Sequence, residues 1–294
     1  KRPGVRFRSG ARKRNENDTG DPVSMRSQPA KIYGVLGNPI HHSLSPVMHN
    51  AAFEAAGVNA LYVAFESSDL KGSIDGMRAL GIRGMSVTIP FKTSVIPYLD
   101  ALDPLAERIG AVNTLVNRNG QLKGYNTDGL GAMKALRERI DLAGKRCVLV
   151  GAGGAARGIG FMARENGMEL MVANRSVDRG LALADFLDCP FIPLERIGET
   201  VTDVLIQTTP VGMFPHENAS PVPDDVFQKE MVVMDAIYNP LETHLLKTAR
   251  AHGCATISGL EMFIHQGAEQ FRLWTGLNPP MDVMRAVVKN ALLK

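Results

Sequence analysis

The sequence predicts an α/β protein of two α/β domains, the second built on a doubly wound parallel sheet. Short apolar runs typical of buried parallel strands alternate with helical segments along most of the chain. The length of 294 residues exceeds that of a usual single-core domain, so two domains are expected. A glycine-rich segment, Gly151-Ala-Gly-Gly-Ala-Ala156, separates an apolar run from a helical one, as the turn after the first strand of such a sheet does.

The first α/β run begins near Lys31. Strands are predicted at 32–36, 60–65, 84–90 and 111–116, and helices at 45–57, 69–80 and 104–109. In the first helix Ser45 fits the N-cap, Pro46 the first helical position and Gly57 the C-terminal cap. We therefore expect a β-α-β-α-β-α-β order in this part of the chain.

The second α/β run follows Asp128. Helices are predicted at 129–140, 156–166 and 177–187, and strands at 145–150, 169–173, 203–207 and 232–236. Residues 259–294 are predicted to form two helices separated by Asn278-Pro-Pro280. We expect residues 31–127 and 260–294 to form one discontinuous N-terminal domain, and residues 128–259 to form a Rossmann-like domain.

The N-terminal segment carries all of the excess positive charge. Residues 1–26 contain eight of the 33 Lys and Arg but only three of the 30 acidic residues, which leaves 25 bases and 27 acids in the rest. Because this segment is Arg-rich and has no helical period, residues 1–30 are predicted to be a disordered basic extension. The remainder is near neutral, so its charge gives no argument for nucleic-acid or membrane binding.

Cysteine usage and hydropathy favour a cytoplasmic protein. Cys147, Cys189 and Cys254 are odd in number and far apart, so neither a disulfide framework nor a zinc site is indicated. His41-His42 has no third ligand nearby in the sequence, and no metal is expected. The chain also contains no run of about 18 apolar residues, so no segment of it is predicted to span a membrane.

The glycine-rich segment has the pattern and the context of a dinucleotide site. Gly151, Gly153 and Ala156 match G-x-G-x-x-G/A between an apolar strand and a helix. Glycines let the backbone approach a pyrophosphate, which then lies at the positive N-terminus of the helix. Gly154 and Ala155 complete the predicted cofactor-binding loop.

The end of the next strand favours NADP over NAD. An Asp or Glu about 20 residues after the glycines would bind the ribose hydroxyl of NAD. This chain instead has Asn174-Arg175-Ser176, with Arg179 one helical turn further on. Two arginines would pair with a 2′-phosphate, whereas an acid would repel it.

Four further clusters resemble the shikimate dehydrogenase family. They are Gly37-Asn-Pro-Ile-His-His-Ser-Leu-Ser-Pro46, Ser86-Val-Thr-Ile-Pro-Phe-Lys92, Gly110-Ala-Val-Asn-Thr114 and Gly124-Tyr-Asn-Thr-Asp-Gly129. The resemblance runs from about Lys31 to the end of the chain. It implies reversible NADPH-dependent reduction of 3-dehydroshikimate to shikimate, a step toward chorismate and the aromatic amino acids, in a monomer or homodimer with a small-molecule substrate.

The resemblance also implies roles for individual residues. Lys92 and Asp128 would be catalytic: an ammonium beside the ketone oxygen stabilises the negative charge that builds as hydride arrives, and a carboxylate fixes the ammonium. Ser43 and Ser45 would bind the substrate carboxylate with Tyr238 nearby. Hydroxyl-binding roles carry over to Thr88, Asn113 and Gln266, and positions beside the nicotinamide to Thr209, Gly259 and Met262.

Several alternatives remain open from the residues alone. Ser45 could act only as an N-cap, and Asp128 could cap the helix that follows it. The family often has Asn at the position of Ser86, and Asn-Ala-Thr where this chain has Gln207-Thr-Thr209, which puts fine specificity in question. A quinate and shikimate dehydrogenase that uses NAD, and a non-catalytic NADP-binding sensor, are the rival functions.

Overall fold

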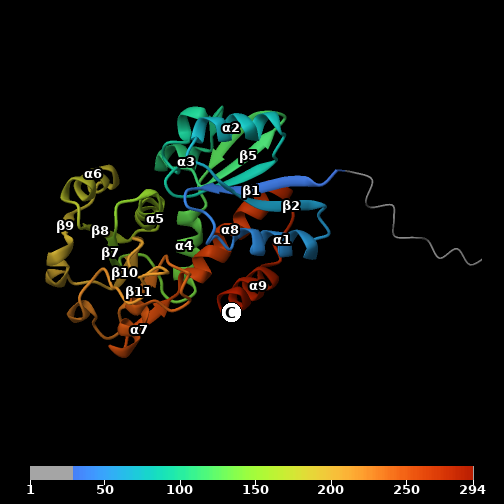
Figure 1. Cartoon of the computed structure of the whole chain (residues 1–294). Coiled ribbons are helices and arrows are strands. Elements are labelled where there is room, and N and C mark those ends of the chain that lie inside the picture. The colour runs from blue at the N-terminus through green and yellow to red at the C-terminus, as the bar shows by residue number, and fades with distance from the viewer. Residues whose placement is uncertain (1–28, 294) are drawn as a thin grey trace, which may run out of the picture.

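A computed structural model describes residues 29–293, which form two α/β halves, each with a six-stranded sheet (Figure 1). The expected fold class of two α/β domains, the second of them Rossmann-like, is therefore confirmed, and the first sheet is mixed. The predicted disordered extension lies, apart from its last two residues, outside the described part of the chain.

The first sheet has the strand order β2-β1-β3-β5-β6-β4. β1, β2 and β3 are parallel, whereas β5 is antiparallel to both β3 and β6. The elements are β1 (Lys31–Gly37), α1 (Ser45–Ala55), β2 (Ala60–Glu66), α2 (Leu70–Ala79), β3 (Gly84–Val87), β4 (Ala101–Leu102), α3 (Pro104–Ile109), β5 (Thr114–Arg118) and β6 (Gln121–Tyr125), with a 3-10 turn at Ile96–Tyr98.

The main difference from prediction in this half is the hairpin of β5 and β6. The strand expected at 111–116 begins only at Thr114, and β4 and β6 were not predicted. Asn119 and Gly120 connect β5 to β6 and both have positive φ, 54° and 86°, as a tight two-residue hairpin turn requires. The Asn-Gly pair was therefore a local signal for the missing strand.

The two capping alternatives are wrong by one residue. The N-cap of α1 is Leu44, so Ser45 is already helical and its hydroxyl caps nothing. The N-cap of α4 (Asp128–Arg137) is Thr127, and Asp128 is the first helical residue. Gly57 follows the C-cap with φ of 65°, as predicted. The side chains of Ser45 and Asp128 are consequently available for other partners.

The second sheet is parallel throughout, with the strand order β12-β11-β10-β7-β8-β9. This is the doubly wound arrangement that was predicted, although β9, β12 and α7 were not expected. The elements are β7 (Arg146–Val150), α5 (Gly154–Glu165), β8 (Glu169–Asn174), α6 (Val177–Leu187), β9 (Phe191–Pro193), β10 (Val204–Gln207), β11 (Val232–Asp235), α7 (His244–Ala251) and β12 (Ala255–Ile257), with 3-10 turns at Leu194–Glu199 and Asp224–Val226.

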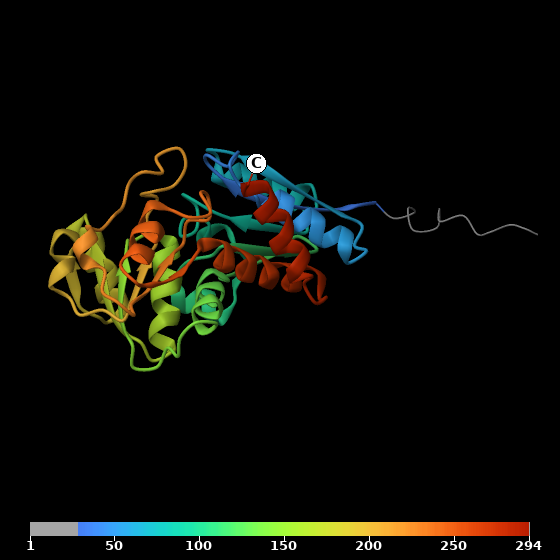
Figure 2. The same cartoon turned by 90° about the horizontal axis from the view of Figure 1, so that it is seen from below.

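The C-terminal helices return to the first half, as Figure 2 shows from below. α8 (Gly259–Thr275) and α9 (Met281–Leu292) pack against each other and against α1. Phe271 and Met284 share a buried cluster with Tyr33 and Phe53 of the first half. Helix α4 packs against both α5 and α8, so these contacts do not fix one boundary between the two domains. The domain limits at 128 and 259 therefore stay a prediction.

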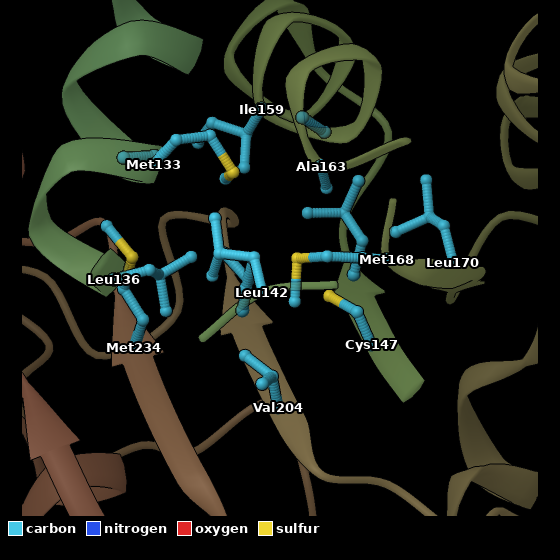
Figure 3. Close-up of a cluster of buried hydrophobic side chains, with 14 of the residues drawn as sticks. Met133, Leu136, Leu142, Cys147, Ile159, Ala163, Met168, Leu170, Val204 and Met234 are labelled. Carbon is cyan, nitrogen blue, oxygen red and sulfur yellow. The ribbon is translucent and has the colours of Figure 1, made fainter. Parts of the chain in front are cut away.

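One of the two hydrophobic core clusters of the second half lies between the sheet and the helices α4 and α5 (Figure 3). Met133 and Leu136 from α4, and Ile159 from α5, face the strand residues Cys147 and Met234. Burying such side chains contributes roughly 1.5–3 kcal/mol each. Cys147 is 1% exposed and belongs to this core. Among the described residues, no helix combines the length and the apolar character that crossing a bilayer requires.

Glycines allow α4 to approach its neighbours closely. A Cβ at Gly129 would lie 2.3 Å from the carbonyl oxygen of Gly158 in α5. A Cβ at Gly131 would lie 2.9 Å from the backbone of α8 at Met262 and Gln266. Helix α4, which begins at Asp128, is therefore fixed between two helices by backbone contact.

We expect Gly129→Ala to lower the free energy of unfolding by roughly 2 kcal/mol, because overpacking forces the helix backbones apart. Gly76→Ala is the matched control: Gly76 lies inside α2 with no atom within 4 Å of an added Cβ. That variant should gain roughly 0.5–1 kcal/mol from helix propensity. Urea unfolding measures the free energy of unfolding of both variants. Equal free energies for the two variants would contradict the close packing of α4 on α5.

Candidate active site

A cavity of about 460 Å³ lies between the two halves, at the carboxyl ends of strands from both sheets. Open α/β sheets bind ligands at this edge. The lining includes Ser43, Ser45, Ser86, Thr88, Lys92, Asn113 and Asp128 from the first part of the chain, and Ala155, Thr209, Tyr238, Gly259, Met262, Gln266 and Gln270 from the second. The wall therefore contains both predicted catalytic residues and every predicted substrate-binding residue.

Lys92 and Asp128 form an ion pair on the wall of this cavity. The Nζ atom of Lys92 donates to Oδ2 of Asp128 at 2.6 Å, and the side chains are only 14% and 6% exposed. Lys92 follows the β3 strand end and Asp128 opens α4, so residues 36 positions apart are brought together. The expected meeting of these two side chains is present in the structure.

Asn113 holds the other oxygen of Asp128. Its Nδ2 donates to Oδ1 of Asp128 and to the hydroxyl of Thr127, both at 2.9 Å. Its own Oδ1 accepts from the backbone N–H of Thr127 at 2.9 Å and from the hydroxyl of Thr114 at 2.8 Å. Both oxygens of the buried carboxylate therefore have donors, which offsets part of its desolvation.

Another part of the cavity wall gathers hydroxyl groups from both halves. The hydroxyl of Ser43 accepts from the backbone N–H of Ser45 at 3.3 Å. Tyr238 forms hydrogen bonds with the Ser43 side chain and the Leu44 backbone, and desolvation raises the pKa of its phenol. Tyr238 also stacks on Phe263, with ring centroids 4.4 Å apart. This cluster of donors suits a carboxylate.

A buried acid fixes the loop that supports Tyr238. Asp235 ends β11, and its carboxylate accepts from the backbone N–H of Ile237 at 3.0 Å and from the hydroxyl of Thr243 at 2.7 Å. Burial raises the pKa of Asp235 to about 6. The two short hydrogen bonds determine how the chain turns from β11 toward the cavity.

Thr88 and Gln266 also line the cavity. Thr88 follows β3, and its backbone N–H donates to Leu36 at 2.9 Å. Gln266 projects from α8 with 8% exposure, and its Nε2 donates to the carbonyl of Phe263 at 2.9 Å. That bond leaves the side-chain carbonyl of Gln266 as an acceptor for a ligand.

The glycine loop has the geometry that a pyrophosphate needs. Gly151 has φ of 117°, and a Cβ there would lie 2.5 Å from the hydroxyl of Thr208. Gly153 is the N-cap of α5, makes no side-chain cap, and has no atom within 4 Å of an added Cβ. No side chain caps the first N–H groups of α5, which lie at the positive end of the helix. A dinucleotide fits this loop.

The predicted cofactor residues fall into two groups in space. Four of them line the cavity, namely Ala155, Thr209, Gly259 and Met262. The others lie at the carboxyl ends of β7 and β8, outside the cavity lining, and are Gly151, Gly153, Gly154, Ala156, Asn174, Arg175, Ser176 and Arg179. The departure at Gln207 is structural: its side chain accepts from Thr209 N–H at 2.7 Å and donates to Thr209 and Val211 carbonyls.

Arg175 and Arg179 are exposed, and neither makes an ion pair or side-chain hydrogen bond with any residue that the structure describes. Asn174 Nδ2 donates to the Ser176 carbonyl at 2.8 Å and shapes the turn into α6. Two unpaired guanidinium groups beside the end of β8 match a phosphate monoester on the ribose.

One group outside the cavity has the atoms of a metal site. The ligand atoms of Glu138, Glu261 and His265 lie within 4.8 Å of one another. His265 Nε2 is, however, 2.9 Å from Glu138, and Arg285 donates three hydrogen bonds to Glu261 at 2.9–3.2 Å. A guanidinium already neutralises this carboxylate, which disfavours a cation beside it.

Sequence reasoning missed the buried polar residues of the cavity floor. Gln270 lies one helical turn after Gln266, and the i, i+4 spacing placed it on the same face of α8. Ser86 lines the cavity and was noted only as a departure from the family. His42 and Phe214 also line the cavity, and their rings meet edge-on with centroids 5.7 Å apart.

The chain is similar to known proteins over most of its length. Residues 35–115 match the family described as Shikimate dehydrogenase substrate binding domain, and residues 259–289 match Shikimate 5′-dehydrogenase C-terminal domain. A Moorella thermoacetica protein named shikimate dehydrogenase (NADP(+)) is 46% identical over 275 residues, which cover 89% of this chain and 93% of that protein.

Two solved structures are also similar. Shikimate 5-dehydrogenase from Thermus thermophilus, in complex with NADP(H) and shikimate, has a TM-score of 0.83 at 40% identity and covers 89% of this chain and 100% of its own. Quinate dehydrogenase from Corynebacterium glutamicum, in complex with NAD, has a TM-score of 0.83 at 33% identity and covers 90% and 100%. With 46% identity to a curated relative across 89% of its length, this chain belongs to the shikimate dehydrogenase family.

Proposed function

We propose that this protein catalyses the reversible NADPH-dependent reduction of 3-dehydroshikimate to shikimate. The observation that carries the proposal is the buried pair of Lys92 and Asp128, 2.6 Å apart on the wall of a polar cavity. The glycine loop before α5 supports a dinucleotide at the same edge of the second sheet. Relatives at 42–47% identity are named shikimate dehydrogenase (NADP(+)).

The reaction needs a proton donor at the ketone oxygen. When bound, the cofactor supplies the hydride. Lys92 would donate a hydrogen bond to the carbonyl oxygen, stabilise the forming alkoxide and assist its protonation. Asp128 holds the ammonium in place and would accept a hydrogen bond from a neighbouring substrate hydroxyl. The side chain of Lys92 is 14% exposed, so little water competes for that ammonium.

The remaining cavity residues would orient the ring. Ser43 and Ser45, with Tyr238 beside them, would bind the substrate carboxylate by hydrogen bonds. Hydroxyl groups of the ring would bind three further polar side chains of the cavity wall, which are Thr88, Asn113 and Gln266. A site that bonds each hydroxyl rejects analogues that lack one.

The cofactor would lie along the second sheet. Gly151, Gly153 and Gly154, with Ala155 and Ala156, would contact the pyrophosphate. Arg175 and Arg179, with Asn174 and Ser176, would hold the 2′-phosphate of NADP. Thr209, Gly259 and Met262 would border the nicotinamide.

The two parts of the chain would bind different ligands. Residues 31–127 and 260–294 would form the substrate domain, and residues 128–259 the NADP domain. The free thiols Cys147 and Cys254 are buried, which suits a reducing cytoplasm as the site of action. A monomer or a homodimer is the proposed assembly.

Oxidation of quinate with NAD is the second candidate, because a quinate dehydrogenase shares the fold at 33% identity. The two arginines after β8 favour NADP. Absorbance of the reduced nicotinamide, followed with shikimate or quinate and with NADP or NAD, distinguishes the functions. We expect the highest rate with shikimate and NADP; NADP binding without any turnover would instead support a sensor.

Lys92→Met should lower kcat for shikimate oxidation by about 10²–10⁴-fold, because the group that stabilises charge on the reacting oxygen is lost. NADP binding, measured by fluorescence titration, should stay within twofold. Lys71→Met is the matched control, since Lys71 pairs with Asp75 at 2.7 Å on an exposed helix. Near-normal turnover of the Lys92 variant would exclude the assigned role.

Arg175→Ala and Arg179→Ala should each weaken NADP binding by roughly 10- to 100-fold, the loss that follows from removing one charge-assisted hydrogen bond. The low rate with NAD should not fall, because NAD has no 2′-phosphate. Arg118→Ala, at the exposed end of β5, serves as the charge control. If the variants lost as much activity with NAD as with NADP, the arginines would not contact the 2′-phosphate.

A further inference from the structure

Gln270 lies in the cavity floor with 2% exposure and uses both ends of its amide. Its Oε1 accepts from the hydroxyl of Ser86 at 2.9 Å and lies 3.3 Å from Nε2 of His49. Its Nε2 donates to the hydroxyl of Thr114 at 3.0 Å and to the carbonyl of Asn113 at 3.4 Å. The backbone carbonyl of Asn113 can only accept, so it fixes the NH2 group of Gln270 on that side and leaves Oε1 to face Ser86 and His49.

The protonation of the neighbours fixes the direction of these bonds. His49 is fully buried, and burial lowers its pKa to about 3, so the ring is neutral at working pH. Its Nε2 faces the carbonyl of Gln270 and must carry the proton, while its Nδ1 has no partner among the described residues. The hydroxyl of Tyr62 donates to Ser86 at 2.7 Å, so the proton of Ser86 is directed to Gln270.

The same direction continues from Gln270 to the catalytic pair. Thr114 accepts from Gln270 and has one hydroxyl proton, which it donates to Oδ1 of Asn113 at 2.8 Å. Oδ1 of Asn113 accepts from this hydroxyl and from the backbone N–H of Thr127, and the two donors together direct its Nδ2 to Asp128 at 2.9 Å. A chain of donors therefore runs from His49 through three side chains to the carboxylate that holds Lys92.

We propose that Gln270 is a positioning residue for the reaction, acting through Thr114 and Asn113 on the orientation of Asp128. Reversing the Gln270 amide would place its NH2 group against His49 and Ser86, and its carbonyl against Thr114. The Thr114 proton would then turn to Gln270, and Asn113 would lose a bond that fixes its amide. This inference rests on the proposed function, because its effect is on hydride transfer.

The test compares Gln270→Met, Thr114→Val and the double variant in shikimate oxidation with NADP. Each single change keeps the side-chain volume but breaks the chain of donors, so kcat should fall about tenfold while KM for shikimate changes less than threefold. The double variant should be no slower than the slower single one, because both interrupt the same chain. The primary isotope effect with shikimate deuterated at C3 should rise in all three.

Two further variants separate positioning from general loss of structure. Thr114→Ser keeps the hydroxyl and should retain near wild-type kcat. Asn117 lies on β5 with Thr114, and its buried side-chain amide forms hydrogen bonds with Met77, Ile82 and Gly120. Asn117→Ala should therefore lower the melting temperature without changing the isotope effect. If Gln270→Met does not fold, the comparison of Thr114→Val with Thr114→Ser still tests the chain.

Unchanged kcat in Gln270→Met and Thr114→Val, multiplicative losses in the double variant, or a Thr114→Ser enzyme as slow as Thr114→Val would overturn the inference. The wild-type protein is measured first in the same assay. Absence of shikimate-dependent NADP reduction at that stage would overturn the proposed function instead.

Discussion

The site depends on an ammonium and a carboxylate held together away from bulk water. Removing two charges from water costs several kcal/mol per ion, and their attraction offsets this only when further hydrogen bonds are made. Asn113 supplies one such bond to Asp128, and the neighbouring Thr127 fixes Asn113. The antiparallel turn of β5 and β6 brings these residues together, so the irregular part of the first sheet serves the ion pair.

Helix α4 links this pair to the second half of the molecule. Asp128 is its first residue, and Gly129 and Gly131 in the same first turn pack closely against the backbones of α5 and α8. A packed backbone cannot shift without disturbing both neighbouring helices. The Asp128 carboxylate therefore has a fixed position relative to the glycine loop that opens α5. The spacing between the two binding regions is thus set by small residues rather than by polar contacts.

Much of the fold could be predicted locally, and the exceptions have physical causes. Apolar periodicity and the turn residues at the ends of elements were enough to predict the strands β7, β8, β10 and β11 and the helix α6. The short edge strands β4, β9 and β12 have two or three residues each, too few for a period to emerge. The N-caps at Ser45 and Asp128 were misplaced by one residue, since backbone angles rather than residue type decide where a helix begins.

The site was predictable where motifs are contiguous and not where partners are distant. Lys92 and Asp128 stand in recognisable segments, whereas Gln270 meets Thr114 across 156 positions of sequence, which no local pattern reports. The contact of Tyr238 with Ser43 joins a loop after β11 to the segment before α1. A molecule held at that contact would touch both halves at once, so its binding free energy would stabilise both of them against unfolding.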